Sequence, residues 1–256
     1  MDTQTTYEFP LNERIRVFMR LEQLFIQLKH FLAGSTTSDK RAVMAILFDV
    51  SMIFSRNNIK SELLKESERL SNVLNKIANN PEVDRTKLDE MLHQLSESKE
   101  RLHQRDGKIG AELINSYLFQ NFSQRGSIPG GTCSFDLPIF HYWLSQDEEK
   151  QARELEAWTK PFLDIHDSVS LVLNLIRQSG VSRQEVAKAG FFQLTLDSSE
   201  VCQLLRVQVL QKNPCYAEIS GGRHRFTVRF MRAALQGERP AQMSTDIAFS
   251  LSCCHL

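Results

Sequence analysis

The stretch Arg223-His224-Arg225-Phe226-Thr227-Val228-Arg229-Phe230 carries the clearest structural pattern in this chain of 256 residues. Charged or polar residues alternate with apolar ones, and successive side chains of a β-strand point to opposite faces of a sheet. We therefore expect a strand from Arg223 to Met231. Its inward face would hold His224, Phe226, Val228 and Phe230, and its outer face Arg223, Arg225, Thr227 and Arg229.

The same period of two recurs on both sides of this strand. It runs from Phe192 to Leu196, from Leu205 to Val209 and from Ile247 to Cys253. Such alternation is typical of half-buried antiparallel strands, and Ser220-Gly221-Gly222 is the expected hairpin turn. The opening segment, with Tyr7 and Phe9 on one face, is expected to add a strand to the same sheet.

Between these regions the apolar residues recur at helical spacing. A first helix is capped by Asn12 and stops at Gly34, and a second starts near Ser38 or Asp39. Two polar helices with narrow apolar seams, separated by Asn79-Asn80-Pro81, predict an antiparallel hairpin that projects from the body or forms a dimer contact. Further helices are expected at residues 111–124, 137–144, 147–158 and 161–178, with Asp136 able to cap the second of these four.

These patterns predict an α+β protein. Residues 1–10 form the N-terminal strand of the β lobe, residues 11–185 form a helical lobe with a hairpin at about 57–105, and residues 186–256 form an antiparallel β lobe. Such a division agrees with the separation of helical and strand-rich segments in α+β folds.

Composition and charge exclude several classes of protein. Lys and Arg number 31 and so do Asp and Glu, which argues against a general nucleic-acid binder because phosphate attraction needs a basic surplus. The longest apolar run, Ala42 to Phe48, is too short to span a membrane, and the five cysteines show no disulfide or zinc pattern. We expect a soluble cytoplasmic protein with reduced thiols.

The zero net charge conceals an uneven distribution. Residues 186–256 contain eight Lys and Arg against five Asp and Glu, a surplus of +3, so the remainder carries −3. Part of the surplus is the row of arginines on the outer strand face. In the first predicted helix, outside this region, Arg16 and Arg20 are four residues apart and therefore neighbours on one helical face. Like charges so placed are relieved by solvent and local acids, or by an anionic partner in a groove between the lobes.

Catalysis and metal binding have weaker support. Cys133, Asp136 and His141 lie within nine residues and suggest a thiol enzyme using Cys133 and His141, but no nucleophile signature surrounds them. His141 is alternatively a packing residue, or a hydrogen-bond donor to a carboxylate. The seven histidines show no metal-ligand spacing. We therefore expect no catalytic residue, no metal and no cofactor.

Five segments together resemble a known family. They are YEFPLNERIRVFMRLE from Tyr7, RNNIKSELLKESERL from Arg56, SIPGGTCSFDLPIFHYWL from Ser127, LNLIRQS from Leu173 and ISGGRHRFTVRFM from Ile219. In this order they are similar to the ZapD family of bacterial Z-ring-associated cell-division proteins. The resemblance extends over essentially the whole chain.

This resemblance implies a non-enzymatic cytoplasmic protein that acts in septation at midcell. Proteins of the family form homodimers, bind the C-terminal tail of the tubulin-like GTPase FtsZ in a basic pocket between the lobes, and bundle its protofilaments. Arg20, Arg56, His141 and Arg225 fall on motifs that match that pocket. Some relatives have an arginine where this chain has Asn115-Ser116-Tyr117, so we expect Arg125 to replace that contact or the contact to be absent.

The expected tail-binding set combines these residues with the arginines identified from strand and helix patterns. No nucleic acid or membrane partner is expected. The complete set is Arg16, Arg20, Arg56, Arg125, His141, Arg223, Arg225 and Arg229.

Overall fold

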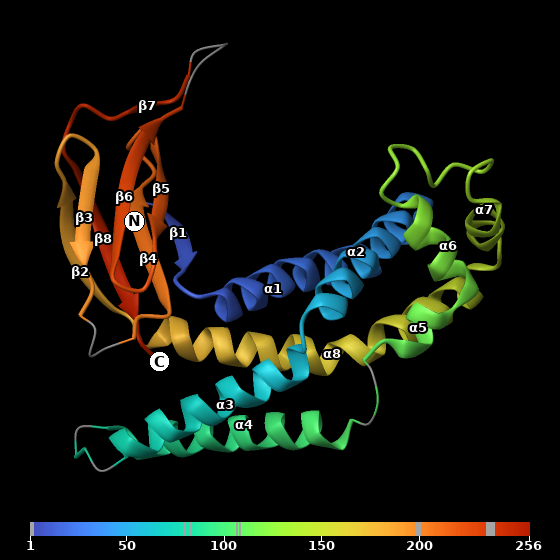
Figure 1. Cartoon of the computed structure of the whole chain (residues 1–256), viewed down its shortest axis with the longest axis horizontal. Helices are drawn as coiled ribbons and strands as arrows, with labels where there is room; N and C mark the ends of the chain where they lie inside the picture. Colours follow the sequence, from blue (N-terminus) through green and yellow to red (C-terminus); the bar gives the residue numbers. More distant parts are fainter. Residues whose placement is uncertain are drawn as a thin grey trace. The chain divides into compact units, whose positions relative to one another are not determined.

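A computed structural model describes residues 3–78, 80–81, 83–105, 107, 109–197, 201–233 and 239–256 of the chain. The chain divides into two compact units. Unit 1 contains residues 1–18 and 173–256 and holds the strands, and unit 2 contains residues 19–172 and is helical (Figure 1). The predicted α+β class, with helices first and antiparallel strands after them, is confirmed.

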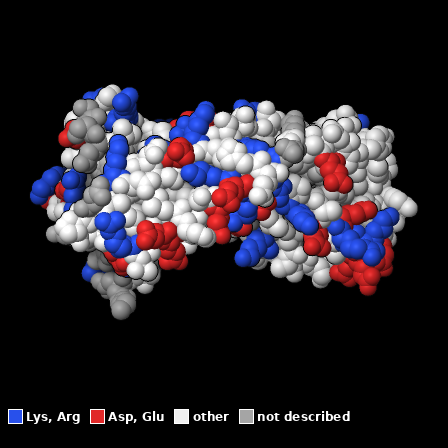
Figure 2. Space-filling view, turned by 90° about the horizontal axis from the view of Figure 1, so that it is seen from below, with Lys and Arg blue, Asp and Glu red and all other residues white. Residues whose placement is uncertain are grey.

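Charged side chains of both signs are interspersed on the surface. Figure 2 shows Lys and Arg beside Asp and Glu over most of the face in view. This distribution agrees with the equal numbers of basic and acidic residues, so a binding site for an anion must depend on a few residues whose charge no local acid neutralises.

Unit 1 contains two antiparallel sheets. Sheet A has the strand order β1-β4-β8-β2, and sheet B has the order β3-β6-β5 with the short β7 paired to β6. The strands are β1 (Gln4–Pro10), β2 (Val181–Ala187), β3 (Phe191–Thr195), β4 (Leu204–Leu210), β5 (Cys215–Gly221), β6 (Arg225–Arg232), β7 (Ala241–Gln242) and β8 (Ile247–Cys254).

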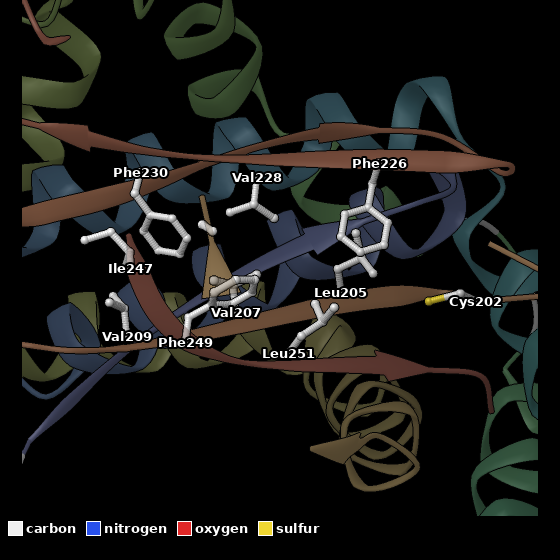
Figure 3. Packing of buried hydrophobic residues seen from close by; sticks show 11 residues of the cluster. Cys202, Leu205, Val207, Val209, Phe226, Val228, Phe230, Ile247, Phe249 and Leu251 are labelled. Carbon is white, nitrogen blue, oxygen red and sulfur yellow. The ribbon is translucent and has the colours of Figure 1, made fainter. Parts of the chain in front are cut away.

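The two sheets enclose one apolar core. Phe226, Val228 and Phe230 of β6 face residues from β4 and β8, including Phe249 and Leu251, and all five side chains are buried (Figure 3). The rings of Phe230 and Phe249 have centroids 5.1 Å apart. This packing confirms the predicted inward direction of alternate β6 residues.

The sequence predicts strand β1 but not strand β2. The N-terminal strand β1 pairs with β4 as predicted, with Tyr7 opposite Val207. Strand β2, however, begins at Val181 and precedes the predicted start of the strand pattern at Gly190. Because β2 is an edge strand that pairs with β8 alone and exposes most of its side chains, it lacks the apolar alternation that marks the other strands.

Unit 2 contains most of the helical residues. The helices of the chain are α1 (Glu13–Leu32), α2 (Thr37–Arg56), α3 (Ile59–Ile77), α4 (Arg85–Gln104), α5 (Ala111–Asn115), α6 (Tyr117–Arg125), α7 (Pro138–Leu144) and α8 (Glu148–Gln178). The side chain of Asn12 accepts a hydrogen bond of 2.9 Å from the backbone of Ile15, as expected for the cap of α1. Helix α2 starts earlier than predicted, because Thr36 and Asp39 form a capping box.

The predicted helical hairpin is formed by α3 and α4, which lie side by side (Figure 1). Its apolar seams are buried, as Leu63, Leu70 and Leu95 show. Helix α4 also packs against α8, where the buried hydroxyls of Ser98 and Ser168 are 2.8 Å apart. Of the turn predicted at Asn79-Asn80-Pro81, Asn79 lies outside the described residues.

Two predicted helix boundaries are wrong. Ser116 ends α5 and caps α6 through a hydrogen bond from Phe119, so the helix predicted at 111–124 is divided. Conversely, α8 continues through Pro161, where a break was predicted. Proline removes the hydrogen bond to the carbonyl of Ala157, and this residue is exposed, so water can satisfy the carbonyl.

None of the described helices is by itself long and apolar enough to cross a bilayer. Helices α2 and α3 reach the required length and composition only together, across a bend of 73°.

Candidate functional site: unpaired arginines in each unit

The hairpin between β5 and β6 places three of the predicted arginines. The backbone N–H of Gly222 donates to the carbonyl of Arg225 over 3.0 Å, which leaves Arg223 and His224 as the two residues of the turn. The turn predicted at Ser220-Gly221-Gly222 is therefore displaced, because β5 continues through Gly221 opposite Phe226. His224, predicted to face inward, is exposed in this turn.

The outer face of β6 carries Arg225, Thr227 and Arg229, as predicted. Arg225 and Arg229 are exposed, while Thr227 is half-buried between them. The Thr227 hydroxyl lies 2.8 Å from the hydroxyl of Ser220 on β5. Arg229 lies opposite Phe191 of β3 and Glu218 of β5 in the sheet register.

These arginines keep their charge available. Within the described part of the chain, Arg223, Arg225 and Arg229 form no ion pair, and Glu218 instead accepts a hydrogen bond of 3.4 Å from Tyr216. A pocket of about 490 Å³ opens at this end of sheet B. Its lining includes Gln193, Ser220, Arg223, Arg225 and Thr227, whose guanidinium, hydroxyl and amide groups are of the kinds that bind carboxylates.

Two other arginines of unit 1 are neutralised by a shared carboxylate. Glu8 of β1 receives hydrogen bonds from Arg177 of α8 at 2.8 Å and from Arg206 of β4 at 2.9 Å. The Glu8 side chain is 17% exposed, so these bonds hold the strand and the helix end together in a partly desolvated site. No local sequence pattern indicates this cluster, because its three members are distant in the chain.

On helix α1 the two predicted arginines differ. Arg16 contacts Glu13 at 3.2 Å, donates to the carbonyl of Pro10 and lies over the ring of Phe9. This side chain therefore has a local structural role in unit 1. Arg20, one turn later in unit 2, is exposed and forms no ion pair with any described residue.

A second pocket in unit 2 lies at the corner between α2 and α3. It measures about 390 Å³ and is lined by Arg56, Asn57, Asn58 and Lys60 among others. Arg56 is exposed, and no acidic side chain among the described residues pairs with it. Lys60, which was not among the predicted site residues, donates to the backbone carbonyl of Arg105 over 2.6 Å.

The segment that contains α6 and α7 holds the last two predicted residues. Arg125 is 3.4 Å from Asp136, so its charge is partly balanced. The prediction that Asp136 caps α7 is wrong, because the helix follows Leu137 without a side-chain cap. His141 is exposed, so its interpretation as a packing residue is also wrong.

The geometry of Cys133 gives no support to thiol catalysis. Its thiol lies 3.4 Å from a carboxylate oxygen of Asp136. Over the described ranges, no hydrogen bond joins Cys133 to His141, so the thiol lacks the adjacent base that activates a nucleophile. Those residues also contain no group of three or more His, Cys, Asp and Glu side chains arranged to hold a metal ion.

The unpaired arginines thus fall in both units. Sheet B of unit 1 carries three of them: Arg223 lies in the turn between β5 and β6, and Arg225 and Arg229 lie on β6. Unit 2 contains Arg20 and Arg56. The expectation that the two groups line one groove stays a prediction from the sequence.

Comparison with known proteins identifies the family. The family model described as "ZapD: Cell division protein" matches residues 19–229. The chain is 46% identical to Cell division protein ZapD of Methylococcus capsulatus over the full length of both chains. It is 34% identical to the protein of the same name from Aromatoleum aromaticum, over 98% of this chain and 97% of that one. The chain therefore belongs to the ZapD family, and its role is in cell division.

Proposed function

We propose that this protein binds the acidic C-terminal tail of FtsZ and, as a homodimer, cross-links and bundles FtsZ protofilaments in the cytoplasm at midcell. In this role it is a non-enzymatic factor that promotes assembly of the Z-ring and the division septum. The observation that carries the proposal is the exposed arginine pair Arg225 and Arg229, which lacks acidic partners among the described residues.

An acidic peptide with some apolar residues suits this surface. Guanidinium groups form paired hydrogen bonds with carboxylates, and the exposed Phe191 beside Arg229 offers an apolar contact. Arg20 and Arg56 would add cationic contacts from unit 2. A dimer with two such sites would link two filaments, because the second binding event occurs at a high effective concentration.

The neutral composition of the chain supports selection of one peptide rather than polyanions in general. Four basic side chains of unit 1 outside the candidate site have acidic partners: Arg183 pairs with Glu185, Lys188 with Asp246, and both Arg177 and Arg206 with Glu8. Attraction is therefore concentrated on a few arginines, and nucleic acid would meet alternating charge over the remaining surface.

Charge reversal at one arginine tests the proposal. We expect Arg225→Glu to weaken binding of an FtsZ tail peptide by at least about 30-fold, because loss of a charge-assisted hydrogen bond costs about 2 kcal/mol or more. Binding is measured by fluorescence anisotropy, and circular dichroism verifies the fold. Arg20→Glu should act in the same direction.

Arg183→Glu is the matched control because it changes the net charge equally on sheet A. It should alter peptide affinity by less than about threefold. Equal losses for Arg183→Glu and Arg225→Glu would show that only net charge matters, and unchanged affinity for Arg225→Glu would refute the assignment of this face.

A further inference from the structure

Three of the five cysteines gather in unit 1, where the start of β4 meets the end of β8. Cys202 lies two residues before β4, and Cys253 and Cys254 are the last two residues of β8. All five thiols of the chain are free. The candidate site on sheet B includes none of these three cysteines, so the proposed function gives them no role.

A β-bulge brings Cys202 toward Cys253. Leu204 pairs with Cys254 in the register of the two strands, and the backbone N–H of Gln203 also donates to the carbonyl of Cys254 over 2.7 Å. Two residues of one strand therefore face a single residue of the other, which is the arrangement of a bulge. The extra residue moves Cys202 one position closer to Cys253 than regular pairing would.

Cys202 and Cys253 lie on the same face of sheet A. Cys202 belongs to the apolar core between the two sheets, at one end of the cluster (Figure 3), and Cys253 packs against that core. The thiol of Cys202 donates a hydrogen bond to Cys253 and is 3.6 Å from the carbonyl oxygen of Leu204. The two sulfur atoms are therefore neighbours in the fold although 50 residues separate them in the chain.

Cys254 points to the opposite face of the sheet. Consecutive side chains of a strand alternate in direction, and the Cys254 thiol lies 3.9 Å from the carbonyl oxygen of Arg177 in α8. Cys254 is fully buried, and burial raises its pKa to about 11. It therefore lacks both the direction and the ionised sulfur that a reaction with Cys202 or Cys253 requires.

The two thiols of the pair differ in reactivity. The hydrogen bond from Cys202 lowers the pKa of Cys253, the charge of Arg183 adds to this effect, and burial and the charge of Glu185 oppose it. The same hydrogen bond and burial raise the pKa of Cys202. Cys253 is half-buried, whereas Cys202 is only 6% exposed. An accessible thiolate beside a protonated thiol is the arrangement of an attacking cysteine and a resolving cysteine.

We propose that Cys253 and Cys202 form a redox-modification site, at which hydrogen peroxide converts the two thiols into a disulfide between β8 and the segment that leads into β4. The inference goes beyond the proposed function and is independent of it. Disulfides that form in a reducing cytoplasm are usually transient and redox-sensing, and this pair has the asymmetry that such a role needs.

The reaction has two steps. The thiolate of Cys253 attacks one oxygen of hydrogen peroxide, so the O–O bond breaks, an S–O bond forms and the hydroxide that leaves is protonated to water. The sulfur of Cys202 then loses its proton and attacks the sulfenic acid of Cys253, so the S–O bond breaks and the S–S bond forms. The second hydroxide takes up that proton. In total, two thiols and one peroxide give one disulfide and two water molecules, and the sulfurs lose the two electrons that the peroxide gains.

A disulfide at this position fits the fold of unit 1. Cys202 precedes the paired residues of β4, so its sulfur can approach Cys253 without breaking a pair of the ladder. The bond would close a loop that contains β5 and β6. Because such a loop restricts the unfolded chain, the oxidised protein should unfold at a higher temperature than the reduced protein.

The experiment treats the full chain with hydrogen peroxide, blocks the remaining thiols with iodoacetamide and maps the digested peptides by mass spectrometry. We expect a cross-link between Cys202 and Cys253 and an unfolding midpoint at least about 4 °C above that of the reduced chain. Both should revert with dithiothreitol, because thiol–disulfide exchange reduces the bond.

Cys215 of β5 is the internal comparison for the rate of oxidation. It is half-buried like Cys253, but burial raises its pKa. Cys253 should therefore be oxidised at least about tenfold faster than Cys215.

Single substitutions separate the three sulfurs. Cys253→Ser should abolish the cross-link. Cys202→Ala should also abolish it but should leave a sulfenic acid at Cys253, which dimedone traps. Cys254→Ala is the matched control, because it removes the adjacent thiol of the same strand, and it should retain the cross-link. Circular dichroism verifies the fold of each variant.

Several results would overturn the inference. They are a disulfide between Cys253 and Cys254, a cross-link that persists in Cys253→Ser, or equal oxidation rates for Cys253 and Cys215. An oxidised chain whose unfolding midpoint is not raised would contradict the native proximity of the two sulfurs. None of these measurements involves the FtsZ peptide, so a failure here leaves the proposed function unaffected.

Discussion

At the scale of single residues, the arginines of this chain fall into two groups according to their partners. Arg177 and Arg206 share the carboxylate of Glu8 and stabilise the fold of unit 1. Arg225 and Arg229 lack such partners among the described residues and are the candidates for binding. Residue type alone therefore does not distinguish a structural cation from a functional one; the distance to the nearest acid does.

Cys253 provides a residue-scale prediction about pH. The hydrogen bond from the Cys202 thiol lowers the pKa of Cys253 to about 7; the charge of Arg183 adds to this effect, and burial opposes it. The thiolate is the reactive form, so alkylation of Cys253 by iodoacetamide should increase with pH through a midpoint near 7. Mass spectrometry of the modified peptide measures this rate.

Cys202→Ala is the control for this effect. Without the hydrogen bond, the midpoint should move upward toward the ordinary thiol range of about 8.5. An unchanged midpoint in Cys202→Ala would show that the interaction between the two thiols does not cause the shift.

At the scale of secondary-structure elements, Glu8 of β1 links its strand to β4 and α8 by accepting hydrogen bonds from Arg206 and Arg177. We expect Glu8→Gln to lower the free energy of unfolding by about 2 kcal/mol, because two partly desolvated guanidinium groups lose their counter-charge. Urea denaturation measures the change. Glu13→Gln, which removes a carboxylate that is 72% exposed beside Arg16, should change it by less than about 0.5 kcal/mol.

The turn from β2 to β3 supplies a second prediction at this scale. Gly190 has a φ of 71°, and a Cβ atom there would lie 2.7 Å from the carbonyl oxygen of Met243. Gly190→Ala should therefore lower the free energy of unfolding by about 1–3 kcal/mol, measured by thermal denaturation.

The neighbouring Ala189 is the control for this turn. Its φ is 46°, so it already has a left-handed backbone with a side chain present. Ala189→Gly relieves that strain and should change stability by less than about 1 kcal/mol, in the stabilising direction. A loss in Ala189→Gly equal to that in Gly190→Ala would contradict the backbone explanation.

At the scale of the whole molecule, function is proposed to depend on a few exposed arginines in a chain whose charges balance. The chain has no net charge, and Figure 2 shows acidic and basic side chains interspersed on one face. Long-range attraction is thus weak, and a short-range contact between a few arginines and an acidic tail would provide selectivity.

Salt dependence tests this arrangement. Raising the salt concentration from about 0.05 to 0.5 M should slow association of the tail peptide with the full chain at least about fivefold, because screening acts on exposed charges. The dissociation rate should change less, since apolar contacts determine residence time. Stopped-flow fluorescence measures both rates, and an association rate independent of salt would contradict a charge-directed encounter.

The sequence was sufficient for several features. Alternation at Phe226, Val228 and Phe230 predicted their burial, Asn12 predicted the start of α1, and Tyr7 and Phe9 predicted the added strand β1. Each of these depends on local period or capping chemistry, which neighbouring residues determine. The family motifs supplied Arg56, for which no local pattern existed, and added His141 to the expected tail-binding set.

Other features were decided by tertiary structure. Strand β2 is polar and is a strand because it pairs with β8, and Pro161 is tolerated in α8 because the carbonyl it leaves free is on an exposed residue. Which arginines are neutralised depends on acids far away in the chain, as Glu8 shows for Arg206. The sequence by itself therefore determined which faces are apolar or basic, whereas tertiary contacts decided which of those faces remain available, because burial and ion pairing join residues that the sequence separates.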